Sequence, residues 1–229
     1  MDSRHPFVSM FYDQVPRSFV ADALRTLFTS YEQGYHLCQD NMDSSEAADV
    51  RAQVRRAVLE TNLRAVAGRY PTADIKVEKN SKRSSSFTSL SFGPISMTAS
   101  KVRSPYGLPR QAKFRAAKIE VQSSLFQVHS VVLTHPRLYA ILTHGSDTTV
   151  IRRIEDGEVN AGERFAQAQL LYPAFARLVF PTSERRYETF IDLFRDYPEV
   201  VAEFLPKVED VEVTPVVPVR LRKPKKDDA

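Results

Sequence analysis

The hydrophobic period of the sequence changes at Pro71, and this change limits the folds that the chain can adopt. Before it, apolar residues recur every three or four positions over residues 16–38 and again over residues 43–68, as they do on amphipathic helices. After it, Asp74–Lys79 alternates polar and apolar residues, as a half-buried strand does. Helices grouped ahead of strands predict an α+β fold.

The two expected helices have recognisable ends. The first is expected from Pro16, which suits a first helical turn, to about Cys38, and Gly34 is expected to weaken or end it. The second is expected from Asp43, which opens a capping-box spacing, to Gly68, a residue type common just past a helix. The short polar segment between them predicts an antiparallel helical pair.

A central antiparallel sheet is expected next. Residues 87–92 and 95–102 flank Gly93-Pro94 and predict a hairpin. Residues 137–144 and 175–180 predict two further strands, the second closed by Pro181. A C-terminal amphipathic helix is expected over residues 184–197, because Tyr187, Phe190, Ile191 and Phe194 would share one face. A short apolar helix is expected over residues 199–205.

Length and composition fit one domain with a flexible tail. A chain of 229 residues with 42% hydrophobic content can bury a substantial core, and we expect a single α+β domain over residues 1–205. Residues 206–229 are rich in proline and lysine and predict a flexible tail. The lone cysteine, Cys38, excludes an internal disulfide framework and fits a reducing cytoplasm. No stretch approaches 18 apolar residues and no secretory signal is evident, so we expect a cytoplasmic protein without a membrane partner.

Metal and phosphate motifs are missing from the sequence. His129, His135 and His144 lie in three different local contexts, and no second cysteine accompanies Cys38. No glycine-rich phosphate loop occurs either. We therefore expect no metal and no cofactor.

Two alternatives involving DNA remain open. Asp74 and Glu120, followed by Gln122, loosely match the carboxylates that hold Mg²⁺ in restriction-type nucleases, although 46 residues separate the two acids. The net charge of +4 and the basic segments 79–83 and 110–118 are compatible with a DNA-binding regulator. Solvated surface is the plainer interpretation of both sets.

The most specific signal is a pentapeptide, Gln122-Ser123-Ser124-Leu125-Phe126. It resembles the Gln-Leu-Ser/Asp-Leu-Phe motif by which bacterial polymerases and repair proteins bind the β sliding clamp. Four of its five positions agree with this motif, and Ser123 replaces the usual Leu. An extended peptide of this kind inserts two adjacent apolar side chains into neighbouring pockets while the glutamine fixes its register. Burying the two side chains contributes roughly 1.5–3 kcal/mol each.

A core role for the same residues is the competing interpretation. Leu125 and Phe126 are followed by the apolar run 128–133, with which they would form one buried element. The chain also repeats the last three motif residues, without the glutamine, in Phe190-Ile-Asp-Leu-Phe194. We assign that copy to the helix expected over residues 184–197.

A wider resemblance favours the clamp. The Phe92-Gly-Pro94 hairpin, the segment Pro109-Arg-Gln-Ala-Lys-Phe-Arg115 and the pentapeptide together resemble the SocB-type toxins of alphaproteobacteria over about residues 92–126. The resemblance implies a toxin, not an enzyme, that occupies the peptide cleft of the β clamp of DNA polymerase III and blocks replication. It also implies a SocA-type antitoxin that delivers the toxin to the ClpXP protease, and contact with DNA only indirectly, at replication forks.

This reading predicts the effect of two substitutions. Gln122→Ala and Phe126→Ala are each expected to abolish clamp binding while the fold survives.

Overall fold

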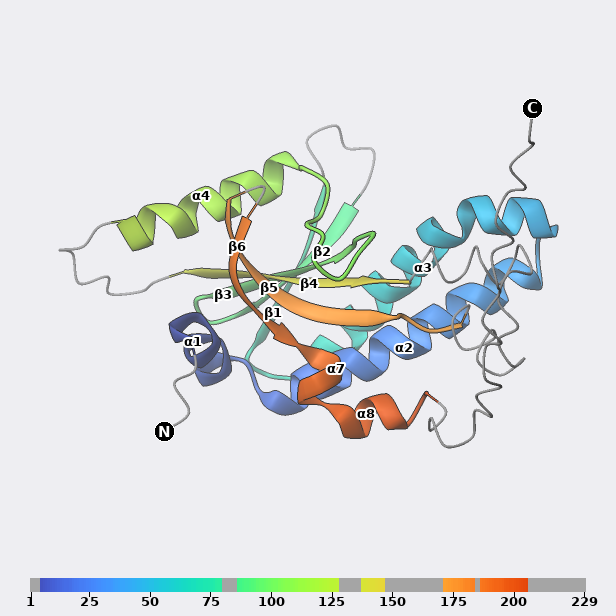
Figure 1. Cartoon of the computed structure of the whole chain (residues 1–229), viewed down its shortest axis with the longest axis horizontal. Coiled ribbons are helices and arrows are strands. Elements are labelled where there is room, and N and C mark those ends of the chain that lie inside the picture. Colours follow the sequence, from blue (N-terminus) through green and yellow to red (C-terminus); the bar gives the residue numbers. More distant parts are fainter. Residues whose placement is uncertain (1–4, 80–85, 128–136, 147–170, 184–185, 206–229) are drawn as a thin grey trace, which may run out of the picture.

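The computed structural model describes residues 5–79, 86–127, 137–146, 171–183 and 186–205, in which helices cover both faces of one central sheet (Figure 1). The helices are α1 (Pro6–Gln14), α2 (Arg17–Gln39), α3 (Ser44–Ala67), α4 (Lys113–Gln127), α7 (Leu193–Asp196) and α8 (Pro198–Ala202). The strands are β1 (Ala73–Lys79), β2 (Ser86–Phe92), β3 (Ile95–Lys101), β4 (Leu138–Gly145), β5 (Phe175–Ser183) and β6 (Arg186–Asp192). The α+β prediction is therefore confirmed.

The six strands lie in the sheet in their order along the chain, β1-β2-β3-β4-β5-β6. Each neighbouring pair is antiparallel except β3 and β4, which are parallel, so the expectation of a purely antiparallel sheet was wrong at this pair. A parallel pair needs a crossover connection. Helix α4 lies in that connection and packs on the face of β4 and β5 opposite the other helices (Figure 1).

Each face of the sheet has its own apolar cluster. On the face toward α1, α2 and α3, large aromatic residues dominate, and Phe11, Phe19, Phe92 and Phe180 are fully buried. On the face toward α4, a smaller cluster joins Ile119 of the helix to Tyr139, Ile141 and Val179 of the strands. Helix α4 is therefore fixed to the sheet by a few apolar contacts and by polar ones.

The expected N-terminal helical pair is confirmed as α2 and α3, which run back along one another (Figure 1). Gly34 does not end α2, contrary to expectation, because the helix continues to Gln39. A Cβ atom at Gly34 would lie 2.6 Å from Cγ of Arg55 on α3. The glycine therefore permits the two helices to approach closely.

The expected hairpin is confirmed as β2 and β3, with Phe92 paired to Ile95 across the turn. Gly93 has a φ of 54°, and Pro94 follows it with a ring that fixes φ near −65°. Positive φ at the first central residue alone corresponds to a type II′ turn, which matches the twist of the two strands.

The C-terminal helix expected over residues 184–197 was wrong. The chain forms β6 over Arg186–Asp192, antiparallel to β5, and only Leu193–Asp196 is helical. Ile191 packs in the main core while Tyr187 and Phe190 pack beside the α4 cluster. Because both faces of this strand meet apolar neighbours, its polar–apolar alternation is lost and its pattern imitates a helix.

Several expectations lie outside the described residues: the apolar run 128–133, the loop beyond residue 146 and the tail over 206–229. Pro181 does not close β5 but lies within it, at a register irregularity next to Phe180. Within the residues that the structure describes, no helix is long and apolar enough to cross a membrane.

Candidate functional site

The pentapeptide lies in the C-terminal half of α4. Gln122, Ser123, Ser124, Leu125 and Phe126 are all helical, whereas a peptide bound in the clamp cleft is expected to be extended. Figure 1 shows α4 crossing the sheet and ending at one end of the molecule. The side chains of residues 123–127 lie outside the described part of the structure, and Gln122 is the motif residue whose contacts are defined.

Gln122 is almost fully buried, with 1% of its surface exposed. Its Nε2 donates to the carbonyl oxygen of Pro181 in β5 at 2.8 Å, and its Oε1 accepts from the backbone N–H of Tyr139 in β4 at 2.7 Å. Buried backbone groups need such partners, and each net hydrogen bond contributes about 0.5–1.5 kcal/mol. Gln122 therefore joins α4 to two strands.

The N-terminal half of α4 is anchored by rings. Phe114 stacks on Phe87 of β2 with ring centroids 3.7 Å apart. Ile119 is buried against Tyr139, whose hydroxyl lies 2.7 Å from Oγ1 of Thr98. Burial raises the pKa of Tyr139 to about 12, so this phenol stays neutral at physiological pH. These contacts hold the start of α4 on the sheet.

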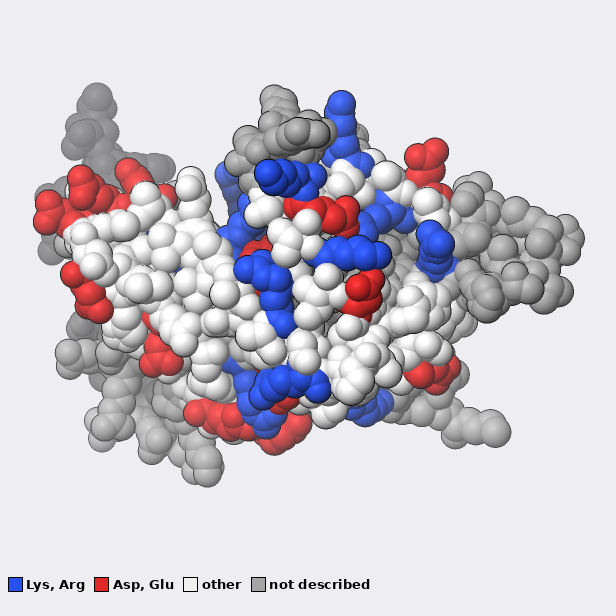
Figure 2. All heavy atoms as spheres, turned by 180° about the vertical axis from the view of Figure 1, so that it is seen from behind, with Lys and Arg blue, Asp and Glu red and all other residues white. Residues whose placement is uncertain are grey.

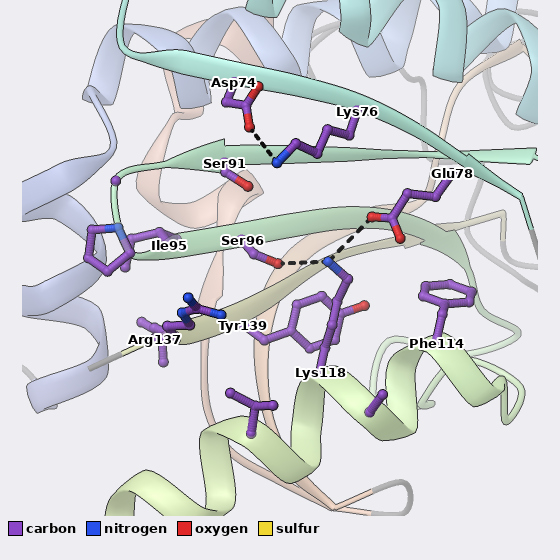
Figure 3. Close-up of a pocket in the computed structure, with 15 residues that line it drawn as sticks. Asp74, Lys76, Glu78, Ser91, Ile95, Ser96, Phe114, Lys118, Arg137 and Tyr139 are labelled. Atoms are coloured by element: carbon purple, nitrogen blue, oxygen red, sulfur yellow. Dashed lines mark hydrogen bonds and ion pairs between the residues drawn. The ribbon is translucent and has the colours of Figure 1, made fainter. Parts of the chain in front are cut away.

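A groove of about 580 Å³ separates α4 from strands β1, β2 and β3 (Figure 3). Lys118 reaches across it from the helix, and its Nζ lies 3.0 Å from Oγ of Ser89, 3.3 Å from Oγ of Ser96 and 3.6 Å from Oε1 of Glu78. On β1, Lys76 pairs with Asp74 at 3.0 Å. The charged groups of this groove are thus largely paired with one another.

Only one of the two carboxylates of the nuclease alternative, that of Asp74, lines this groove. Asp74 lines it from β1 and pairs with Lys76, whereas Glu120 is an exposed residue of α4 that does not belong to its lining. Among the described residues, no three His, Cys, Asp or Glu side chains gather where they would hold a metal ion.

The second copy of the last three motif residues packs in the hydrophobic core. In Phe190-Ile-Asp-Leu-Phe194, Leu193 is 1% exposed, and Phe194 stacks on Phe28 with centroids 5.5 Å apart. The copy spans the end of β6 and the short α7, where the sequence predicted one helix.

A second pocket, which is strongly basic, lies beside the start of α4, and the sequence did not predict it. Arg55 of α3, Lys101 of β3 and His144 of β4 line it together with residues 110–115 of the predicted basic segment. These residues are distant in the chain, and only the parallel pairing of β3 with β4, which sets Lys101 opposite His144, brings two of them side by side. The predicted basic segment 79–83 falls almost wholly outside the described residues.

Comparisons with known proteins gave no relative: no protein-family model, no curated protein and no solved structure matches the chain.

Proposed function

We propose that this protein is a toxin that binds the peptide cleft of the bacterial β sliding clamp through Gln122, Ser123, Ser124, Leu125 and Phe126. The observation that carries the proposal is the pentapeptide itself, whose order of amide, small hydroxyl and two large apolar side chains is the chemistry that such a cleft selects. Its position at the end of α4, away from the helix's aromatic anchor, supports the proposal (Figure 1).

Binding requires the last turns of α4 to open. While the side chain of Gln122 is hydrogen-bonded to β4 and β5, it cannot also form hydrogen bonds at the entrance of the clamp's peptide cleft. Releasing it loses two hydrogen bonds, about 0.5–1.5 kcal/mol each, whereas burying Leu125 and Phe126 gains roughly 1.5–3 kcal/mol each. Opening the helix therefore weakens clamp binding only modestly. With the ordering costs included, we expect a dissociation constant near the micromolar level, which corresponds to a binding free energy of about −8 kcal/mol.

The anchor at the start of α4 suits this role. Because Phe114, Lys118 and Ile119 hold the first turns on the sheet, the last turns can unwind while the rest of the protein stays folded. The body then covers the clamp beside the cleft and excludes polymerase and other clients. On the resemblance to SocB-type toxins, the protein acts in the cytoplasm at replication forks, and a SocA-type antitoxin presents it to ClpXP; no cofactor takes part.

A binding titration tests the proposal. Fluorescently labelled full-length protein is titrated with purified β clamp, using the parent, Phe126→Ala and Leu125→Ala. Loss of the buried ring is expected to weaken binding about 10-fold to 100-fold, from the 1.5–3 kcal/mol of an aromatic or aliphatic side chain. Glu120→Ala, on the same helix and exposed, is the matched control and should bind as the parent does.

Equal clamp affinity of the parent and of both apolar variants would refute the motif as the contact. Folding of each variant is checked by circular dichroism, so that lost binding is not mistaken for lost structure. Mg²⁺-dependent DNA cleavage that disappears in Asp74→Ala would instead favour a nuclease.

A further inference from the structure

A pocket of about 610 Å³ lies among α3, the end of β3 and the first turn of α4, and we call it the basic pocket. Six cationic side chains line it, Arg55, Arg56, Lys101, Arg110, Lys113 and Arg115, and one carboxylate, that of Glu60. Figure 2 shows lysine and arginine over the middle of the molecule's rear face with several carboxylates among them, and a further group of acidic residues toward one end. This excess of positive charge lines a concave site, and a concave site focuses the electrostatic field.

The single carboxylate does not neutralise the basic pocket. Oε2 of Glu60 accepts a hydrogen bond from the backbone N–H of Thr88 at 2.6 Å, and Oε1 lies 4.0 Å from Nε of Arg56. Within the described ranges, Lys101 and Lys113 form no ion pair with a carboxylate. At least two of the six cations are therefore uncompensated by the described part of the chain.

Arg115 is held in place by neutral groups. Its guanidinium donates to the carbonyl oxygen of Arg110 at 2.7 Å and to Oγ of Ser100 at 3.1 Å, both uncharged acceptors. Its Nε is buried and has no hydrogen-bond partner among the described atoms. A fixed guanidinium with donors to spare is the group that recognises phosphate oxygens in pairs.

The floor of the pocket is deeply buried. Arg55 is 7% exposed and lies over the ring of Tyr31 at 4.8 Å, and the Tyr31 hydroxyl lies 2.8 Å from Nδ1 of His144. Burial, with Lys101 and Arg55 nearby, lowers the pKa of His144 to about 3, and burial lowers the pKa of Arg55 to about 10. Burial also lowers the pKa of Lys101 and of Arg115. All four shifts disfavour positive charge, and a bound anion would oppose them.

We propose that the basic pocket binds an oligophosphate anion, either free or as the phosphate chain of a nucleotide. Its volume lies within the roughly 300–1,000 Å³ of small-molecule sites. Cations that converge on a buried floor suit a compact, multiply charged ligand better than a flat duplex, whose phosphates need an exposed basic surface. Phe87 and Phe114, stacked at 3.7 Å, add an apolar wall on which a nucleoside could lie.

Isothermal titration of the full chain tests this inference, with tripolyphosphate, ATP, adenosine and inorganic phosphate as probes. Tripolyphosphate and ATP are expected to bind, adenosine not, and inorganic phosphate at least 10-fold more weakly than tripolyphosphate. Equal affinities for tripolyphosphate and ATP assign the site to the phosphate chain alone, and a preference for ATP adds the nucleoside.

Matched variants separate the pocket from general surface charge. Lys101→Gln and Arg115→Gln are each expected to weaken tripolyphosphate binding at least 10-fold, whereas Lys76→Gln and Arg137→Gln, which remove cations from the groove of Figure 3, should leave it unchanged. The thermal stability of each unliganded variant is measured alongside.

Three results would overturn the inference: no binding at millimolar tripolyphosphate in low salt, equal weakening by the groove variants, or affinity that rises with the length of an oligonucleotide and ignores the pocket variants. None of these results bears on the clamp, so this inference and the proposed function fail or stand separately.

Discussion

Replacement of Gln122 probes the joint between α4 and the sheet. Gln122→Ala leaves the carbonyl oxygen of Pro181 and the N–H of Tyr139 buried without their partner, since both bonds end on the same side chain. An unpaired buried polar group costs about 1–3 kcal/mol. We expect the two together to lower the free energy of unfolding by roughly 2–6 kcal/mol.

Urea denaturation followed by circular dichroism measures this loss. With a urea dependence of about 2 kcal/mol per molar, the midpoint should fall by about 1–3 M. Gln122→Glu is the sharper companion, because it keeps an acceptor for Tyr139 N–H but sets a carboxylate oxygen against the carbonyl oxygen of Pro181. It should destabilise the protein as well, and more strongly above the pKa of the new carboxylate than below it.

An unchanged midpoint in Gln122→Ala would refute the placement of Gln122 as a buried joint. The sequence alone predicted that this variant would lose clamp binding with its fold intact; the two buried hydrogen bonds predict instead that its folded state is also destabilised. Clamp binding must therefore be tested through Phe126 and Leu125, whose substitution does not break these two bonds.

Three further outcomes follow from the same structure. The pKa of His144 is about 3 in the folded state, whereas an unfolded histidine takes up a proton near pH 6.5. The free energy of unfolding should therefore fall as the pH drops from about 6.5 toward 3, by about 2 kcal/mol at pH 5. Urea titrations of His144→Gln should lack this pH-dependent loss of stability. Gly34→Ala should lower the thermal midpoint, since the new Cβ would lie 2.6 Å from Cγ of Arg55; a stabilised variant, as helix propensity alone predicts, would contradict the close packing of α2 on α3. A synthetic peptide of residues 118–127 should bind the clamp about tenfold more tightly than the intact chain, because it has no α4 to open; weaker binding by the peptide would show that the folded body contributes more than the helix costs.

The elements that the sequence predicted well are those whose two faces differ. Helices α2 and α3 have an apolar stripe, and polar and apolar residues alternate along β1, so their periods are visible in the sequence. The β2–β3 hairpin is encoded by Gly93-Pro94, since only glycine takes the positive φ cheaply. Local chemistry was sufficient in each case.

The elements that the sequence missed depend on their surroundings. Strand β6 was mistaken for a helix because it is covered on both faces. Helix α1 was overlooked, although Pro6 at its first turn and the buried pair Phe7 and Phe11 were usable signals. The burial of Gln122 had no local signal at all, because its partners come from β4 and β5.

The basic pocket shows the same dependence on tertiary structure. Its cations come from α3, β3, the loop after β3 and α4, and along the chain each was compatible with a solvated surface. Only the sheet order, with β3 parallel to β4, places Lys101 beside His144 above Arg55. The sequence shows these charged residues, but it does not show that they converge on one pocket.

Competition at the clamp cleft tests the central proposal most directly. A labelled peptide carrying the consensus Gln-Leu-Ser-Leu-Phe is bound to purified β clamp, and its displacement is followed by fluorescence polarisation as full-length protein is added. The parent should displace half of the peptide at micromolar concentration and nearly all of it in large excess, and Phe126→Ala should need at least 10-fold more. Failure of the parent to displace the peptide, or equal displacement by parent and Phe126→Ala, would contradict the account.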